Sequence, residues 1–86
     1  MATTATRDYA AAWITRTAAA LVGRTITAVR YLSTEEANDL GWYNRCVVLT
    51  LDDGTQLYPA ADDEGNNAGA LFTTLAALDT IPVVPT

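Results

Sequence analysis

The stretch Leu51-Asp52-Asp53-Gly54-Thr55-Gln56-Leu57-Tyr58-Pro59 decides the fold, because it reads as two strands joined by a tight hairpin. Gly54 suits the positive φ that such turns require, and aspartates are common turn residues. Residues 46–51 form an apolar run, typical of a central strand that a helix covers on at least one side. Residues 55–58 continue as the returning strand, and Pro59 marks its end or an edge position. Antiparallel pairing of these two strands is the first expectation.

Toward the N-terminus the sequence predicts a helix, a strand and a second, short helix. The helix covers residues 8–22, is rich in alanine, and has Gly23 just past its end in the left-handed C′ position. Its apolar side chains favour packing on a sheet, or docking of a second subunit. A strand follows at residues 25–32. The segment Ser33-Thr34-Glu35-Glu36 is a capping box, so a helix starts there and ends at Gly41.

Toward the C-terminus we expect a third helix and a short extended end. Residues 68–78 carry an apolar stripe at helical spacing, formed by Leu71, Phe72, Leu75 and Leu78, with Asn66 or Asn67 as N-cap. Residues 81–85 contain two prolines, which restrict them to a short edge strand or an extended arm.

This order predicts an α+β fold: a small, mainly antiparallel sheet of three or four strands with an N-terminal and a C-terminal helix. The alternatives are a ferredoxin-like βαββαβ arrangement and an Sm- or SH3-like small barrel with an N-terminal helix. We expect residues 1–7 to be a flexible N-terminus and residues 8–86 to form a single domain.

Composition points to a thin core and to self-association. The chain has 86 residues and is 50% hydrophobic, but many of these residues are alanine. A chain of this size buries only about 60% of its unfolded surface, so self-association, metal or disulfides often supplement its core. The single cysteine, Cys46, excludes an intrachain disulfide and a thiolate zinc cluster within one chain. A homo-oligomer is therefore expected.

Charge and hydropathy argue against nucleic-acid and membrane partners. The formal net charge is −5 and all five basic residues are arginines scattered along the chain, so no basic stripe exists for phosphates. No apolar run approaches the roughly 18 residues of a membrane span. The first seven residues lack the features of a signal peptide. We therefore expect no direct nucleic-acid or membrane contact, and a cytoplasmic protein.

The residues that most enzymes rely on are missing. The chain has no histidine and no lysine, which removes Ser-His and Cys-His pairs as well as Schiff-base chemistry. It also lacks a phosphate-binding loop and a dinucleotide fingerprint. We therefore expect a non-enzymatic protein with no cofactor and no catalytic residue.

An acidic segment is the first candidate site. Five of the ten carboxylates lie between Asp52 and Glu64. Three interpretations are open. The carboxylates serve the hairpin turn and the start of a helix, or they form a surface for a basic partner protein. In the third interpretation they bind a divalent cation such as Ca²⁺ or Mg²⁺. A cation would be bound by Asp62, Asp63, Glu64 and Asn66, although their spacing departs from the EF-hand pattern.

The segment Gly41-Trp42-Tyr43-Asn44-Arg45 is the second candidate site. Two large aromatic residues, an amide and an arginine in succession have the composition of an interaction hot spot. The alternative is that one aromatic side chain enters the core while Arg45 pairs with a nearby acid. If this segment is extended, Trp42 and Asn44 lie on one face and Tyr43 and Arg45 on the other.

Three strings resemble a group of short bacterial proteins with no established function. They are Gly41-Trp42-Tyr43-x-Arg45, Leu51-Asp52-Asp53-Gly54-Thr55-x-Leu57-x-Pro59, and Asp62-Asp63-Glu64-Gly65-Asn66 followed by Gly69-Ala70-Leu71-Phe72. The resemblance covers about residues 21–72. It implies a natural, single-domain, cytoplasmic protein, and supplies no catalytic residue.

These observations favour a small self-associating interaction or structural module. One alternative is a domain that binds a divalent cation or small ligand through residues 62–66. Another is an acidic inhibitor of a basic partner protein.

Overall fold

The computed structural model describes residues 4–60 and 68–84, and side chains from Tyr9 onward. Its elements are α1 (Thr4–Leu21), β1 (Ile26–Tyr31), α2 (Thr34–Asp39), β2 (Val47–Leu51), β3 (Gln56–Pro59), β4 (Leu71–Thr73), the 3₁₀ turn η1 (Ala76–Leu78) and β5 (Thr80–Ile81). The α+β class and the antiparallel sheet are confirmed. The sheet has five strands, one more than the largest number predicted.

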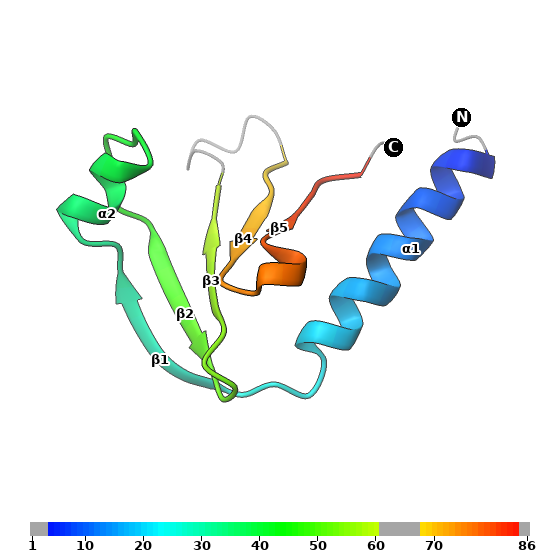
Figure 1. Cartoon of the computed structure of the whole chain (residues 1–86), viewed down its shortest axis with the longest axis horizontal. Coiled ribbons are helices and arrows are strands. Elements are labelled where there is room, and N and C mark those ends of the chain that lie inside the picture. The colour runs from blue at the N-terminus through cyan, green and yellow to red at the C-terminus, as the bar shows by residue number, and fades with distance from the viewer. Residues whose placement is uncertain (1–3, 61–67, 85–86) are drawn as a thin grey trace.

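The sheet is an open meander in which each strand pairs with its neighbour in the chain. The order is β1-β2-β3-β4-β5 and all four pairings are antiparallel. A ferredoxin-like order would place non-consecutive strands side by side, so that alternative is wrong. The Sm- or SH3-like barrel is also wrong, because β1 and β5 are the two edges of the described sheet and do not close it (Figure 1).

The hairpin turn, the helix cap and the glycine helix ends predicted from the sequence are present in the structure. Gly54 has φ +86° in the β2–β3 hairpin, and Asp53 Oδ1 accepts a hydrogen bond from the Thr55 amide at 3.0 Å. Ser33 and Glu36 form the predicted capping box of α2. Gly23 and Gly41, with φ +81° and +76°, follow the ends of the two helices.

The predicted C-terminal helix over residues 68–78 is wrong. Leu71 pairs with Pro59 and Ile81, and Phe72 pairs with Tyr58 and Thr80. This segment is therefore strand β4, which lies between β3 and β5 in the sheet. Only the 3₁₀ turn η1 remains helical. The predicted edge strand near Ile81 is present, but it is limited to Thr80–Ile81.

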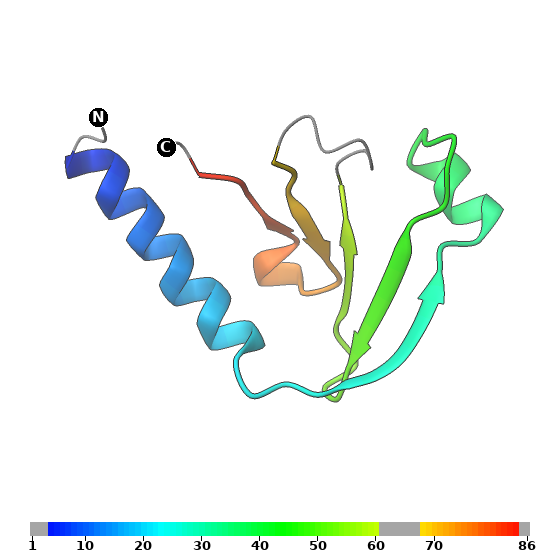
Figure 2. The ribbon, with the colours of Figure 1, turned by 180° about the vertical axis from the view of Figure 1, so that it is seen from behind.

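Helix α1 does not lie across the sheet. Figures 1 and 2 show it diverging from β1 and β2, with η1 between it and the sheet. The extensive packing between described elements is all between neighbouring strands. The predicted packing of the first helix on a sheet is therefore replaced by a contact at η1, where Arg16 Nη2 donates to the Ala77 carbonyl at 3.0 Å.

The core is small and lies under α2 and along β2 and β3. It consists of six apolar residues among those described: Leu32, Ala37, Val48, Leu51, Leu57 and Leu78. Val48 alone is almost fully enclosed, at 1% exposure. By contrast, every residue of β1 is exposed. β2 is thus buried at Val48 on one face and at Leu51 on the other, while Val47, Leu49 and Thr50 are half-buried.

Candidate functional site

A pocket of about 620 Å³ lies where the α2–β2 connection meets the sheet. Its lining comes from the ends of β1 and β3 and the segment between α2 and β2: Tyr31, Gly41, Trp42, Tyr43, Asn44, Arg45, Cys46, Val47, Pro59 and Ala60. Three of the predicted binding residues, Trp42, Tyr43 and Arg45, are therefore brought to one place.

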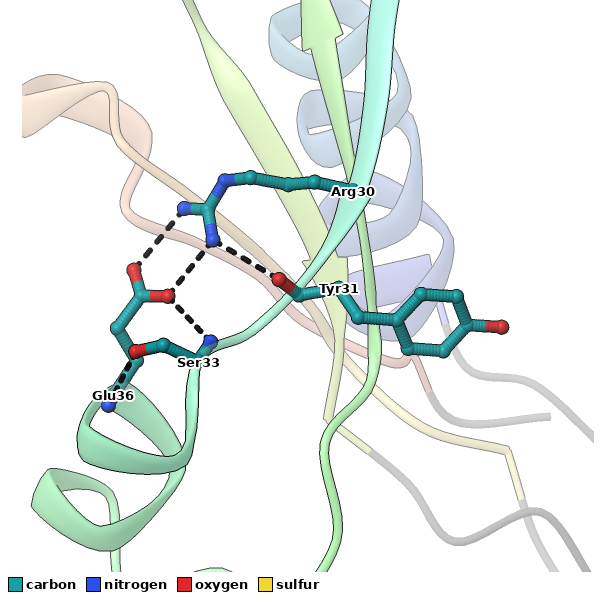
Figure 3. A network of polar contacts seen from close by, with 4 residues as sticks. All are labelled: Arg30, Tyr31, Ser33 and Glu36. Carbon is teal, nitrogen blue, oxygen red and sulfur yellow. Dashed lines mark hydrogen bonds and ion pairs between the residues drawn. The ribbon is translucent and has the colours of Figure 1, made fainter.

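The two faces of the sheet differ at this end. Arg30 faces Val48 in the β1–β2 register, whereas Tyr31 faces Val47. Because neighbouring residues of a strand point to opposite faces, Tyr31 and Val47 lie on the face away from Val48. Figure 3 shows the Arg30 side chain pointing toward α2 and the Tyr31 ring pointing away from it.

The wall of the pocket is held by the end of α2 and by an aromatic cluster. The Trp42 amide donates to the Ala37 carbonyl at 2.9 Å, which turns the chain back toward the sheet. The Trp42 ring stacks on Phe72 at 6.2 Å between centroids and meets the edge of Tyr58 at 6.3 Å. Trp42 is thus a structural residue as well as a lining residue, because such pairs add stability beyond burial.

Tyr43 and Arg45 are free to contact a partner. Tyr43 is fully exposed, at 102%, and Arg45 is exposed and makes no ion pair with any described residue. The predicted pairing of Arg45 with a nearby acid is therefore not found in the described chain. Residues 42–46 form a loop, so the strand-like alternation considered for them does not occur.

Cys46 is half-buried in the lining, and burial raises the pKa of its thiol above the ordinary value. A neutral thiol is a poor nucleophile, so Cys46 fits a packing role. The charged group among the lining residues is Arg45. The pocket thus combines aromatic side chains with Asn44 and Arg45, and its described residues offer no acid–base pair.

The acidic segment divides into a described and an undescribed part. Asp52 and Asp53 lie 3.9 Å and 3.5 Å from the guanidinium of Arg24. The hydrogen bond from the Thr55 amide lowers the pKa of Asp53 below its ordinary value, with Arg24 acting in the same direction. These two acids thus serve the hairpin. The remaining predicted site residues, Asp62, Asp63, Glu64 and Asn66, lie outside the described residues.

No family model, curated protein or solved structure matches this chain. The resemblance of its strings to short bacterial proteins therefore stays a prediction. Within residues 4–60 and 68–84, no helix has the length and apolarity that a membrane span requires. The same ranges hold no group of three or more metal-ligating side chains arranged around one point.

An apolar patch extends from the pocket along β1 and β2, and the sequence did not reveal it. We call Val29, Tyr31, Val47 and Leu49 the β1–β2 patch, because Val29 faces Leu49 and Tyr31 faces Val47. Val29 and Tyr31 are 61% and 58% exposed, and the other two are half-buried. Alternation along a strand places Val29 and Tyr31 on one face, but nothing in the sequence indicated that this face stays uncovered.

Proposed function

We propose that this protein is a small, non-enzymatic module that self-associates through the β1–β2 patch and the adjoining pocket. The proposal rests on the large solvent-exposed area of the single chain. A compact protein of this mass exposes about 4,900 Å², whereas this chain of 9.2 kDa exposes 6145 Å². Its radius of gyration is 14.4 Å, compared with about 12 Å for a compact chain of this length.

The nature of the excess surface supports self-association. Large apolar side chains of α1 and β1 are among the most exposed of the described residues, including Ile14, Val22 and Val29. Contiguous apolar patches of this kind mark interaction sites in proteins. The small core leaves the single chain with little stability of its own, and an interface supplements it.

The two other functions considered depend on the acids of residues 62–64. Cation binding and inhibition of a basic partner rest on side chains outside the described residues. No observation on residues 4–60 and 68–84 favours either of them over self-association.

Light scattering coupled to size exclusion, together with sedimentation equilibrium, tests the proposal. We expect the full chain to have twice its mass of 9.2 kDa at micromolar concentration and to dissociate on dilution. A chain that stays monomeric up to high micromolar concentration would contradict the proposal.

A further inference from the structure

The uncovered part of the sheet has the width of one helix. The β1–β2 patch spans two strands about 4.8 Å apart. An α-helix with its side chains is about 10–12 Å across, so one helix is wide enough to cover both strands. α2 does not provide the cover, because it lies on the other face of β1, where Arg30 binds Glu36 (Figure 3).

Helix α1 carries apolar side chains on more than one side, but only one of these sides packs against the rest of the described chain. Its side toward η1 includes Trp13 and Ala20, which are half-buried. A second apolar stripe at i, i+4, i+8 spacing consists of Ile14, Ala18 and Val22. Ile14 and Val22 are 68% and 77% exposed, and no helix residue from Tyr9 onward is buried. We call these three residues the outer stripe. Helices that are apolar on more than one side are normally covered on more than one side.

The connection between α1 and β1 keeps the two surfaces of one chain apart. Arg24 is tied to Asp52 and Asp53 at the hairpin, so the chain is anchored there. Just before it, Gly23 has φ +81° and turns the helix away from the sheet. On the other side, Arg16 and Ala77 hold α1 against η1. Among the elements of residues 4–60 and 68–84, neither helix of the same chain lies on the β1–β2 patch, so we look for its occupant in a second copy.

We infer that the outer stripe of α1 from one copy covers the β1–β2 patch of a second copy, and the reverse, in a closed two-fold dimer. This inference rests on the proposed self-association and names its partner and contact. The two contacts are equivalent, because under a two-fold axis the outer stripe of each copy meets the β1–β2 patch of the other.

Area and charge both fit this exchange. Relative to a compact chain, each copy has about 1,200 Å² of surplus surface, and two copies together have about 2,400 Å², an area of the size that obligate dimers bury. Charge is divided unequally: α1 holds Arg7, Asp8 and Arg16, a net +1, which leaves −6 for the remainder of a chain of net −5. The helix of one copy is thus attracted to the body of the other.

The experiment uses full-length chains with matched glutamate substitutions. Ile14→Glu alters the outer stripe, and Ala12→Glu, two residues away and therefore on the opposite side of α1, is its control. Val29→Glu alters the β1–β2 patch, and Ala28→Glu on the other face of β1 is its control. Sedimentation equilibrium measures the dimer dissociation constant, and circular dichroism checks that each variant is folded. We expect Ile14→Glu and Val29→Glu to weaken the dimer at least about tenfold and the controls to leave it intact.

Mixing the two weakened variants gives the decisive result. In an exchanged dimer, a mixture of Ile14→Glu and Val29→Glu contains one pair with an undamaged helix on an undamaged patch. Native mass spectrometry should therefore show the mixed dimer in excess over both homodimers. A wild-type dimer that is weakened by only one substitution, or by neither, would overturn the helix exchange while leaving self-association in place. A monomeric wild-type chain would overturn both proposals.

Discussion

The guanidinium of Arg30 binds the carboxylate of Glu36 at two points, with Nη1–Oε1 at 2.7 Å and Nη2–Oε2 at 3.0 Å. Arg30 belongs to β1 and Glu36 to α2, so this pair joins the edge strand to the short helix that follows it (Figure 3). Glu36 also accepts a hydrogen bond from the Ser33 amide at 2.7 Å. One carboxylate therefore completes both an ion pair and the capping box.

We expect acid to destabilise the protein through Glu36. Bonds from Arg30 and then from Ser33 lower the pKa of Glu36 from 4.5 to about 2. Because the folded state lowers this pKa, the stabilising effect is complete above pH 4.5 and is lost as the pH falls toward 2. Glu36→Gln keeps the capping hydrogen bond but removes the charge. Its melting temperature should vary less with pH over this range than that of the wild type.

Glu35→Gln is the control for this pH experiment. Glu35 lies one residue earlier on α2 and makes no ion pair with a described residue. If both variants keep the acid dependence of the wild type, the Arg30–Glu36 pair does not cause it. Added salt should reduce the difference between Glu36→Gln and the wild type only partly, because two-point pairs are held by hydrogen bonds as well as by charge.

Trp42→Ala and Tyr43→Ala should separate a structural from an exposed aromatic residue. Trp42 stacks on Phe72 and meets Tyr58, whereas Tyr43 is fully exposed. We expect Trp42→Ala to lower the free energy of unfolding by about 2–3 kcal/mol. Tyr43→Ala should stay within about 0.5 kcal/mol of the wild type. Urea unfolding at equal protein concentration measures both, and similar losses for the two variants would contradict this assignment.

Thr73 should tolerate serine better than valine. Thr73 is buried, and its hydroxyl donates to the Leu78 carbonyl at 2.6 Å and accepts from the Leu75 amide at 3.0 Å. Thr73→Val keeps the shape but leaves both backbone groups without a partner, which costs about 1–3 kcal/mol. Thr73→Ser keeps the hydroxyl and should cost about 1 kcal/mol, from the lost methyl group. Chemical denaturation decides between them, and a valine variant as stable as the serine variant would be the contrary result.

Asp53→Ala should lower the melting temperature more than Asp52→Ala. Asp53 accepts the Thr55 amide and lies 3.5 Å from Arg24, whereas Asp52 has only a longer, exposed contact at 3.9 Å. Exposed ion pairs contribute little, but a side chain that binds a turn amide stabilises the turn. Scanning calorimetry on both variants compares them directly. Equal midpoints would show that the hydrogen bond to Thr55 contributes nothing.

The features predicted correctly are those that neighbouring residues determine. Gly54 and Asp53 form the hairpin turn because its geometry depends on a few consecutive residues. Ser33 and Glu36 start α2 for the same reason. By contrast, Leu71 and Phe72 have a helical spacing in sequence but become a strand through pairing with Pro59 and Tyr58. That pairing joins residues more than ten positions apart, so local spacing could not reveal it.

The candidate site was predicted only in part. Composition alone pointed to Trp42, Tyr43 and Arg45, and all three line the pocket. Tyr31, Val47 and Pro59 were missed as lining residues, because their meeting depends on the register of three strands. The exposure of β1 was missed because alternation predicts two faces of a strand but not which element covers each face. Here the direction of α1, which ends just before Gly23, leaves this face of β1 uncovered by that helix (Figure 1).

The consecutive order of the five strands has a consequence for how the protein is made. Every strand pairing links consecutive strands and is antiparallel, so the described sheet needs no crossover connection and no strand from a second molecule. The sheet can therefore form within one chain, hairpin by hairpin, before any second molecule is met. Assembly becomes a later, second-order step whose rate rises with the amount of protein in the cell. The pairing of the strands would thus precede association, and the fraction of chains that are associated would rise with protein concentration.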